Sequence, residues 1–293
     1  MKGLFVGLTT LDFLYLVDQV PQPNQKIVAH QQSLSAGGPA TNAAVTFAHC
    51  GHQAQLLSSL GCHPLVPLIH SDLQTWGVEH RDLNPHHDQV PPVSSIMVTR
   101  SSGDRAVVSI NATQATVASP LLKDLELTSL LQGVDIILID GHQIPLGQAI
   151  AVAAQKQNIP VVLDGGSWKP GLEILLPWVT YALCSADFHP PQCHGTQEVF
   201  EFLRKYAIPY CAITQGPDPI LYQTAQQAGA IPLTPVKVQD TLGAGDIFHG
   251  AFCHFILRTD FSQALSQAGH IASFACQFFG TRQWLWAFRQ QQL

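Results

Sequence analysis

Short apolar runs alternate along the chain with segments of helical periodicity. The apolar runs, each predicted to be a strand, lie at residues 4–8, 55–60, 136–139, 161–163, 181–184 and 211–213. Continuous apolar runs are typical of strands covered on both faces. Segments with apolar residues at helical spacing follow them, at residues 39–49, 147–157, 198–206, 243–257 and 261–279. This alternation predicts an α/β fold, a mostly parallel sheet flanked by helices on both faces.

Two other stretches show short alternating segments instead of continuous apolar runs. They lie at residues 27–34 and 93–110, and a Ser-Ser-Gly-Asp turn at residues 101–104 predicts a hairpin in the second. We expect them to form a small separate β-sheet, a lid or a dimer surface, from about residues 13–36 and 92–112. The alternative is that they are edge strands of the main sheet. Residues 1–293 are then one domain that carries this lid.

Composition limits the class of protein. The chain has 293 residues, of which 46% are hydrophobic and only 12% charged, enough apolar residues for a large core. The formal net charge of −6 and the lack of a basic stripe argue against nucleic-acid binding. The apolar runs, such as residues 134–139, are far shorter than the roughly 18 residues of a membrane span, so no membrane association is expected.

The seven cysteines are scattered, without a CxxC pair and without a preceding signal peptide. We therefore expect free thiols and a reducing, cytoplasmic location. The closest cluster of metal-ligating types is His189, Cys193 and His194, with Cys184 nearby. It lies in a loop with Pro and Gly and lacks the spacing of a zinc site, so a surface loop is favoured and no metal-binding side chains are predicted.

The segment with the clearest chemistry is Asp-Thr-Leu-Gly-Ala-Gly-Asp at residues 240–246, directly before a helical pattern. A helix that begins there points unpaired N–H groups and its positive dipole end at one spot, which suits a phosphate. Asp246 is then a candidate base for a hydroxyl that attacks phosphorus. The alternative is a turn at Gly243 and Gly245 with Asp246 as a helix cap. The segment is neither a Walker A loop, because no Lys-Ser/Thr follows, nor a dinucleotide fingerprint.

Two features near the N-terminus suit a ligand site. Gly37 and Gly38 precede the helical pattern at residues 39–49 and allow a ligand to approach the backbone, and Asn42 offers donors and an acceptor. Asp12 follows the first predicted strand, and ligands of open α/β sheets bind beyond the carboxyl ends of strands. A carboxylate there can accept hydrogen bonds from sugar hydroxyls. The alternatives are an ordinary helix start and a turn or helix cap.

Taken together and in chain order, these features resemble the ribokinase/PfkB family of carbohydrate kinases over most of the chain. Asp12 matches the family's N-terminal sugar-binding aspartate, Gly37 and Gly38 with Asn42 resemble its GG…N signature, and residues 240–246 match its DTxGAGD signature without a departure. The resemblance implies a ribokinase-like core with a β lid that covers the sugar and often makes a homodimer. It also implies transfer of the γ-phosphoryl group of MgATP to a hydroxyl.

The resemblance also implies residue roles. Asp246 would be the catalytic base, and the backbone of Gly243, Ala244 and Gly245 would form the anion hole for charge on the phosphoryl oxygens. The sugar would be held by residues from the first strand, the glycine pair and the lid hairpin: Asp12, Gly38, Asn42, Arg105 and Asn111. For Arg105, a surface salt bridge is the alternative.

On the nucleotide side, residues 213–216 resemble the family's TxG strand end, with Pro219 in place of the usual second glycine. The family's NxxE element, which orders magnesium-bound waters, is missing at residues 184–188, so how Mg²⁺ is held stays open. The residues expected beside the nucleotide are Ser185, Thr214, Gly216, Lys169 and His270.

The expected function is therefore an ATP-dependent sugar kinase, and residues 6–18, the spelling of the 240–246 motif and Ser185 favour a ketose. A nucleoside kinase or phosphosugar kinase of the same family is an alternative. So are a non-catalytic binder of sugar or nucleotide and an assembly protein that uses the lid only to dimerise. The sequence leaves the sugar, the hydroxyl attacked, any monovalent-cation requirement and the oligomeric state open.

Overall fold

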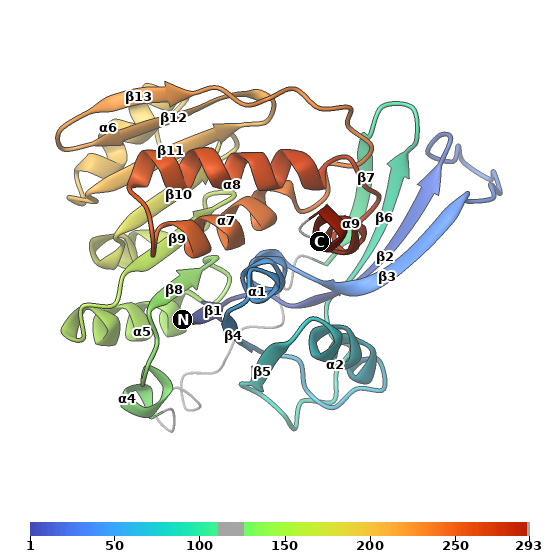
Figure 1. Ribbon diagram of the computed structural model, residues 1–293. Helices are drawn as coiled ribbons and strands as arrows, with labels where there is room; N and C mark the ends of the chain where they lie inside the picture. Colours follow the sequence, from blue (N-terminus) through green and yellow to red (C-terminus); the bar gives the residue numbers. More distant parts are fainter. Residues whose placement is uncertain (111–125, 292–293) are drawn as a thin grey trace.

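A large, mostly parallel sheet forms the centre of the molecule. The computed structural model describes residues 1–110 and 126–291, and within them nine strands form one sheet in the order β13-β12-β11-β10-β9-β8-β1-β4-β5 (Figure 1). The strands from β11 to β5 pair in parallel, and β12 and β13 extend the sheet antiparallel. Their bounds are β1 Lys2–Val6, β4 Gln53–Ser58, β5 Val78–Asp82, β8 Ile136–Ile139, β9 Val161–Gly165, β10 Tyr181–Ser185, β11 Tyr210–Gln215, β12 Asp218–Thr224 and β13 Ala228–Ile231.

Helices cover both faces of this sheet, as the sequence predicted. Side chains of β1 alternate between two buried clusters, because successive residues of a strand point to opposite faces: Phe5 packs in one cluster, and Leu4 and Val6 in the other. The first cluster includes residues of α1 (Pro39–His49), α2 (Val66–Thr75), α7 (Ala244–Phe255), α8 (Phe261–Ala275) and α9 (Gln283–Gln291). The second includes residues of α4 (Leu127–Leu130), α5 (Ile144–Lys156) and α6 (Thr196–Arg204).

A small second sheet projects to one side of the molecule, at the right of Figure 1. Its order is β3-β2-β6-β7, with bounds β2 Thr10–Val17, β3 Gln31–Gly37, β6 Val93–Thr99 and β7 Arg105–Ser109. The separate lid sheet is therefore confirmed, and the alternative of edge strands in the main sheet is wrong. One face of this sheet packs around Phe279 through the buried side chains of Leu14, Leu16, Ile96 and Val98.

The structure corrects two details near the lid. Residues 27–30 are not a strand, because β3 begins only at Gln31. Asp12 comes after the first strand, which ends at Val6, but it does not lie in a loop at the carboxyl end of that strand. It lies inside β2, paired with Ser35 of β3, so the lid sheet itself carries this carboxylate.

Several elements gave no usable sequence signal. The pattern did not predict α2, α9, β5, β12 or β13, and the helix expected over residues 261–279 ends at Ala275. β5 shows why: its sequence is Val-Glu-His-Arg-Asp, and as the last strand of the sheet it needs no continuous apolar run.

No helix in the described ranges is long and apolar enough to cross a membrane. All seven cysteines are free thiols, as the sequence predicted.

Candidate active site

The 240–246 segment forms a tight loop that leads into α7. Gly243 is the N-cap residue, with a left-handed φ of 69°, and a Cβ atom there would lie 2.7 Å from Cγ2 of Thr281. Buried Asp240 shapes the loop, because its carboxylate accepts hydrogen bonds from the backbone N–H groups of Leu242 and Gly280, both at 2.8 Å. The first turn of α7 is thereby presented at the surface, with Gly245 exposed. Amides of a first turn lack helical partners and suit an anion.

One of these amides is already engaged. The N–H of Ala244 donates a long hydrogen bond of 3.3 Å to the carbonyl oxygen of Thr241. The first helical hydrogen bond of α7 runs from Ile247 to the Gly243 carbonyl, at 2.8 Å. The anion-binding role expected for the backbone of Gly243, Ala244 and Gly245 therefore stays a prediction, and it requires the Ala244 N–H to exchange this long bond for a ligand.

Asp246 lies in this first turn, partly buried. Burial raises the pKa of its carboxyl to about 6, and the nearby carboxylates of Asp164 and Asp140 contribute, while a hydrogen bond from Asn42 and the neighbouring His249 oppose the shift. The Asn42 bond runs from Nδ2 to Oδ2 of Asp246 and measures 2.8 Å. A carboxyl with such a pKa is ionised at neutral pH yet basic enough to accept a proton in a reaction.

His249 connects the start of α7 to β9 and β10, a role the sequence did not suggest. It is buried one helical turn after Gly245, and its Nδ1 lies 2.6 Å from the Gly245 carbonyl oxygen and 3.5 Å from Oδ2 of Asp164. Its Nε2 lies 3.1 Å from the carbonyl oxygen of Leu183. The only available signal was its spacing of four residues after Gly245, which places both on one face of a helix.

The sequence also did not single out Asp140, because it is a single acidic residue after an apolar run. Its buried carboxylate accepts hydrogen bonds from the backbone N–H groups of Leu8 (2.8 Å) and Ala40 (3.3 Å) and of His142 (2.9 Å). Burial alone would raise its pKa, but the His142 side chain and the N–H groups of Leu8 and His142 outweigh burial and lower the pKa to about 2. Asp140 thus joins the ends of β8 and β1 to the start of α1.

The glycine pair before α1 has a steric explanation. A Cβ atom on Gly37 would overlap the carboxylate of Asp12, which also accepts a 2.6 Å hydrogen bond from Oγ1 of Thr10. A Cβ atom on Gly38, whose φ is 97°, would overlap the carbonyl oxygen of Leu8. Burial raises the pKa of Asp12, although hydrogen bonds from Thr10 and other groups lower it. The pair therefore makes room for the Asp12 carboxylate and turns the chain into α1.

The lid touches the 240–246 loop through Arg105. This exposed residue of β7 donates from Nη1 to Oγ1 of Thr241, at 2.6 Å, so its hydrogen-bond partner is a hydroxyl of the 240–246 loop and not the acidic residue that a surface salt bridge requires. Asn111, the other residue expected from the lid hairpin, lies outside the described residues.

Three of the residues expected beside the nucleotide lie together. Ser185 and Thr214 are paired at the carboxyl ends of β10 and β11, and Gly216 follows with a φ of 62°. Oγ of Ser185 donates to the carbonyl oxygen of Gly166, at 2.8 Å, which connects it to the end of β9. This common edge is where ligands of open α/β sheets bind.

Lys169 and His270 differ in their placement. Lys169 lies in the loop after β9, with Nζ 3.4 Å from the carbonyl oxygen of Ser167 and its side chain beside Gly141. His270 is exposed on α8, and its role at the adenine remains a prediction.

Comparisons with known proteins identify the family of this chain. The model of the pfkB family carbohydrate kinases matches residues 2–287. The ribokinase of Bacillus subtilis (strain 168) is 23% identical over 280 residues, which cover 94% of this chain and 93% of the relative. The ketohexokinase of Mus musculus is 23% identical over 292 residues, covering 95% of each.

Solved structures confirm the ribokinase-like fold. The Thermotoga maritima ribokinase superimposes with a TM-score of 0.75 at 18% identity, covering 99% of both chains. The Arabidopsis thaliana ribokinase, solved with ribose and ATP, gives a TM-score of 0.74 at 19% identity, covering 95% of this chain and 93% of the other. Since the family model spans nearly the whole sequence, this chain belongs to the pfkB family of carbohydrate kinases.

Proposed function

We propose that the protein transfers the γ-phosphoryl group of MgATP to a hydroxyl of a small, unphosphorylated sugar, with Asp246 as the catalytic base. The observation that carries this proposal is the position of Asp246: its carboxyl, with a pKa of about 6, lies in the first turn of α7 and accepts a hydrogen bond from Asn42. Family membership supports the kinase class.

The proposed reaction needs few protein groups. Asp246 accepts the proton of the sugar hydroxyl while the hydroxyl oxygen attacks the γ-phosphorus in line. The bond between the γ-phosphorus and the bridging oxygen breaks, and ADP leaves with the electron pair. The backbone amides at Gly243, Ala244 and Gly245 would stabilise the charge that develops on the phosphoryl oxygens.

We propose that the sugar lies against Asp12, Gly38 and Asn42, where the lid strand meets α1. The absence of a phosphate on the sugar is inferred from the charges nearby. The arginine next to Asn42, Arg282, is buried and donates from all three nitrogens to internal acceptors, and of the residues expected around the sugar only Arg105 is a cation. A phosphosugar would need additional uncommitted cations, so a neutral acceptor suits the site better.

ATP is proposed on the edge formed by Ser185, Thr214 and Gly216, with Lys169 near the phosphates. The described residues contain no group of three or more His, Cys, Asp or Glu side chains that could hold a metal ion. This fits magnesium, which proteins often hold through nucleotide phosphates and water and not through a cage of side chains. Bound to the nucleotide, the ion would neutralise charge on the phosphoryl oxygens.

A panel of acceptors tests the proposal and narrows the substrate. Relatives carry the names ribokinase, deoxyribokinase and ketohexokinase, and the motif spelling favours a ketose. We expect MgATP-dependent release of ADP, with a sugar phosphate as product, for at least one of fructose, ribose and deoxyribose. Turnover only with nucleosides or with phosphosugars would support those alternatives. Binding of sugar and nucleotide without any product would indicate a non-catalytic binder.

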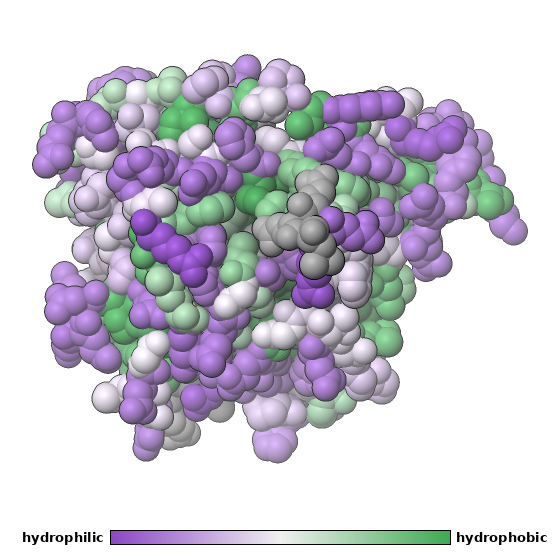
Figure 2. All heavy atoms as spheres, in the orientation of Figure 1, coloured by the Kyte–Doolittle hydropathy of each residue, from purple (hydrophilic) through white to green (hydrophobic). Residues whose placement is uncertain are grey.

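We also propose that the lid sheet forms a homodimer. Cross-strand register places Leu34, Phe13 and Val108 on the face of this sheet opposite to the one that packs around Phe279, and Leu34 and Val108 are exposed. Hydrophobic residues, coloured green, are visible among hydrophilic ones where the lid lies, at the right of Figure 2. Exposed apolar residues on one face suit a partner surface. Analytical ultracentrifugation should therefore give a dimer, converted to monomer by Val108→Glu; a wild-type monomer would contradict this.

A further inference from the structure

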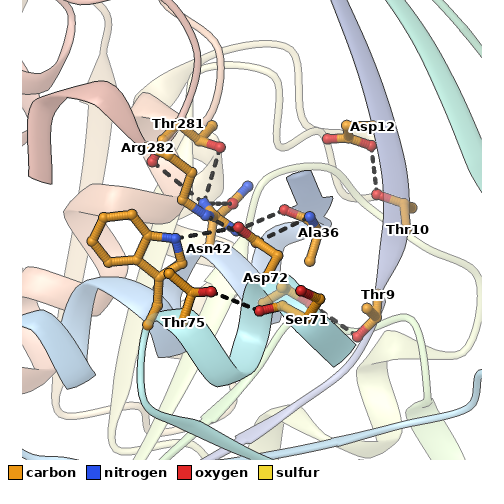
Figure 3. Close-up of polar contacts among 12 residues, drawn as sticks. Thr9, Thr10, Asp12, Ala36, Asn42, Ser71, Asp72, Thr75, Thr281 and Arg282 are labelled. Atoms are coloured by element: carbon orange, nitrogen blue, oxygen red, sulfur yellow. Dashed lines mark hydrogen bonds and ion pairs between the residues drawn. The ribbon is translucent and has the colours of Figure 1, made fainter. Parts of the chain in front are cut away.

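A buried arginine from the C-terminal segment connects the lid strand to the helix that carries Asn42. Nη1 of Arg282 donates to Oδ1 of Asn42 and to Oγ1 of Thr281, both at 2.9 Å. Nη2 donates to the carbonyl oxygen of Ala36 (2.7 Å) and to Oδ2 of Asp72 (3.0 Å), and Nε donates to the same carboxylate oxygen (3.1 Å). These contacts converge in Figure 3. Burial of a guanidinium is unfavourable unless its donors are paired, and here every nitrogen has a partner.

This arrangement fixes the orientation of the Asn42 side chain. Its amide lies between Arg282, which has only donors, and the carboxylate of Asp246, which when ionised has only acceptors. Only one orientation satisfies both neighbours, with Oδ1 toward the guanidinium and Nδ2 toward the carboxylate. The reverse orientation would place oxygen against oxygen and nitrogen against nitrogen.

The same arginine holds the end of the lid strand. Ala36, the residue of β3 before Gly37, has both backbone groups bound: its carbonyl oxygen accepts from Arg282, and its N–H donates to Asp72 of α2 at 3.1 Å. Gly37 is the residue that leaves room for the Asp12 carboxylate. One ion pair therefore holds the backbone beside the proposed sugar-binding carboxylate and the amide beside the proposed base.

We propose that Arg282 is a positioning residue for phosphoryl transfer: its guanidinium holds the Asn42 amide in the orientation that donates to Asp246 and fixes the end of β3 relative to that amide. The inference rests on the proposed role of Asp246 as the base. Arg282 itself does not contact Asp246 and acts only through Asn42.

A shift of the pH profile follows from this arrangement. The groups that face Asp246 are Asp164 from β9, Asp140 after β8, His249 of α7 and Asn42 of α1. Burial and the two carboxylates raise the pKa of Asp246, and the Asn42 hydrogen bond lowers it. Loss of that bond moves the pKa further up. Because the base works in its ionised form, the acid limb of the kcat/KM profile then moves to higher pH.

Arg282→Lys tests the proposal, because it keeps the charge but cannot hold both Asn42 and Ala36 with the planar fork. We expect the acid limb of kcat/KM for the sugar to move up by about one pH unit, the size of one hydrogen bond to a charged group. The loss of kcat/KM below the limb should then be about tenfold larger than at about pH 8.5. A loss of kcat/KM that is equal at every pH, with the acid limb unmoved, would overturn the proposal and leave Arg282 a merely structural residue.

A matched control comes from the same C-terminal segment. Arg289 of α9 lies with its guanidinium carbon 5.7 Å from the ring centroid of Trp76 and 5.6 Å from that of Trp286, a cation–π arrangement away from Asn42. Arg289→Lys should leave the pH profile unchanged. A shift equal to that of Arg282→Lys would contradict the assignment to Arg282.

A second variant keeps the test decisive if Arg282→Lys does not fold. Asp72→Asn removes the carboxylate from the other side of the guanidinium and should move the acid limb in the same direction by a smaller amount; an unmoved limb would overturn the proposal. The role of Asp246 is tested separately with Asp246→Asn. If that variant keeps turnover, the proposed base is wrong. If Asp246→Asn has no turnover but the acid limb does not move in the Arg282 and Asp72 variants, only the proposed role of Arg282 is refuted.

Discussion

Asp246→Asn should reduce kcat by about 10²- to 10⁴-fold, the usual span for removal of a general base. Asparagine has nearly the same shape, so substrate binding should change little and the effect should appear in kcat. The measurement is steady-state kinetics of ADP release with saturating MgATP and the best sugar from the panel.

Thermal unfolding supplies the control for this variant. The ionised carboxyl of Asp246 is held near two other carboxylates, those of Asp164 and Asp140, and its raised pKa means that the folded state binds its proton more tightly than the unfolded state. The stability contribution of this group therefore falls as pH rises from the ordinary aspartate range through about 6. The neutral side chain should not lower Tm at pH 8. A variant with kcat within tenfold of the wild type, by contrast, would exclude Asp246 as the base.

Gly243→Ala should be the second most damaging substitution. The left-handed φ of 69° is strained for any residue with a Cβ atom, and that atom would lie 2.7 Å from Cγ2 of Thr281. We expect a loss of about 1–3 kcal/mol in the free energy of unfolding. The shift of the first turn of α7 should also lower kcat by about 10²- to 10³-fold, as removal of an oxyanion donor does.

Two comparisons separate strain from a general effect of added methyl groups. Gly195→Ala, at an extended φ of −151° with no atom within 4 Å of the new Cβ, should leave kcat unchanged and cost less stability than Gly243→Ala, although Gly195 is the N-cap of α6. Thr281→Ser removes the methyl group that would clash but keeps the hydroxyl that accepts from Arg282, so adding it to Gly243→Ala should restore part of the stability. If Gly243→Ala matches the wild type in both kcat and unfolding, the loop does not need its left-handed residue.

Local sequence was sufficient to predict those elements whose own residue pattern shows how the element is buried. The strand at residues 136–139 and the helix at residues 39–49 have the predicted bounds, because a continuous apolar run and an Ala-rich helical pattern reflect burial of the element itself. The 240–246 motif is also contiguous, so its glycines and its acid could be assigned to the start of a helix before any tertiary contact was known. The lid sheet was predicted from the alternating segments at residues 27–34 and 93–110.

Local sequence failed where an element depends on its neighbours. The polar β5 is a strand because it pairs with β4 at the sheet edge, and Asp12 belongs to the lid because β2 pairs with β3 and β6. His249 and Asp140 have no distinctive neighbours in the sequence. Their partners come from strand ends and helix starts that only the fold brings together.

The sequence by itself determined the α/β class and the position of the 240–246 motif with its carboxylate at a helix start, because these features depend on residues a few positions apart. Only the tertiary structure decided what surrounds that carboxylate. Asn42 and Asp246 are 204 positions apart, and Arg282 and Asp72 are 210 apart. Contacts at such separations depend on how the sheet and its helices pack, and that packing also determines the burial and the neighbouring charges that raise the pKa of Asp246.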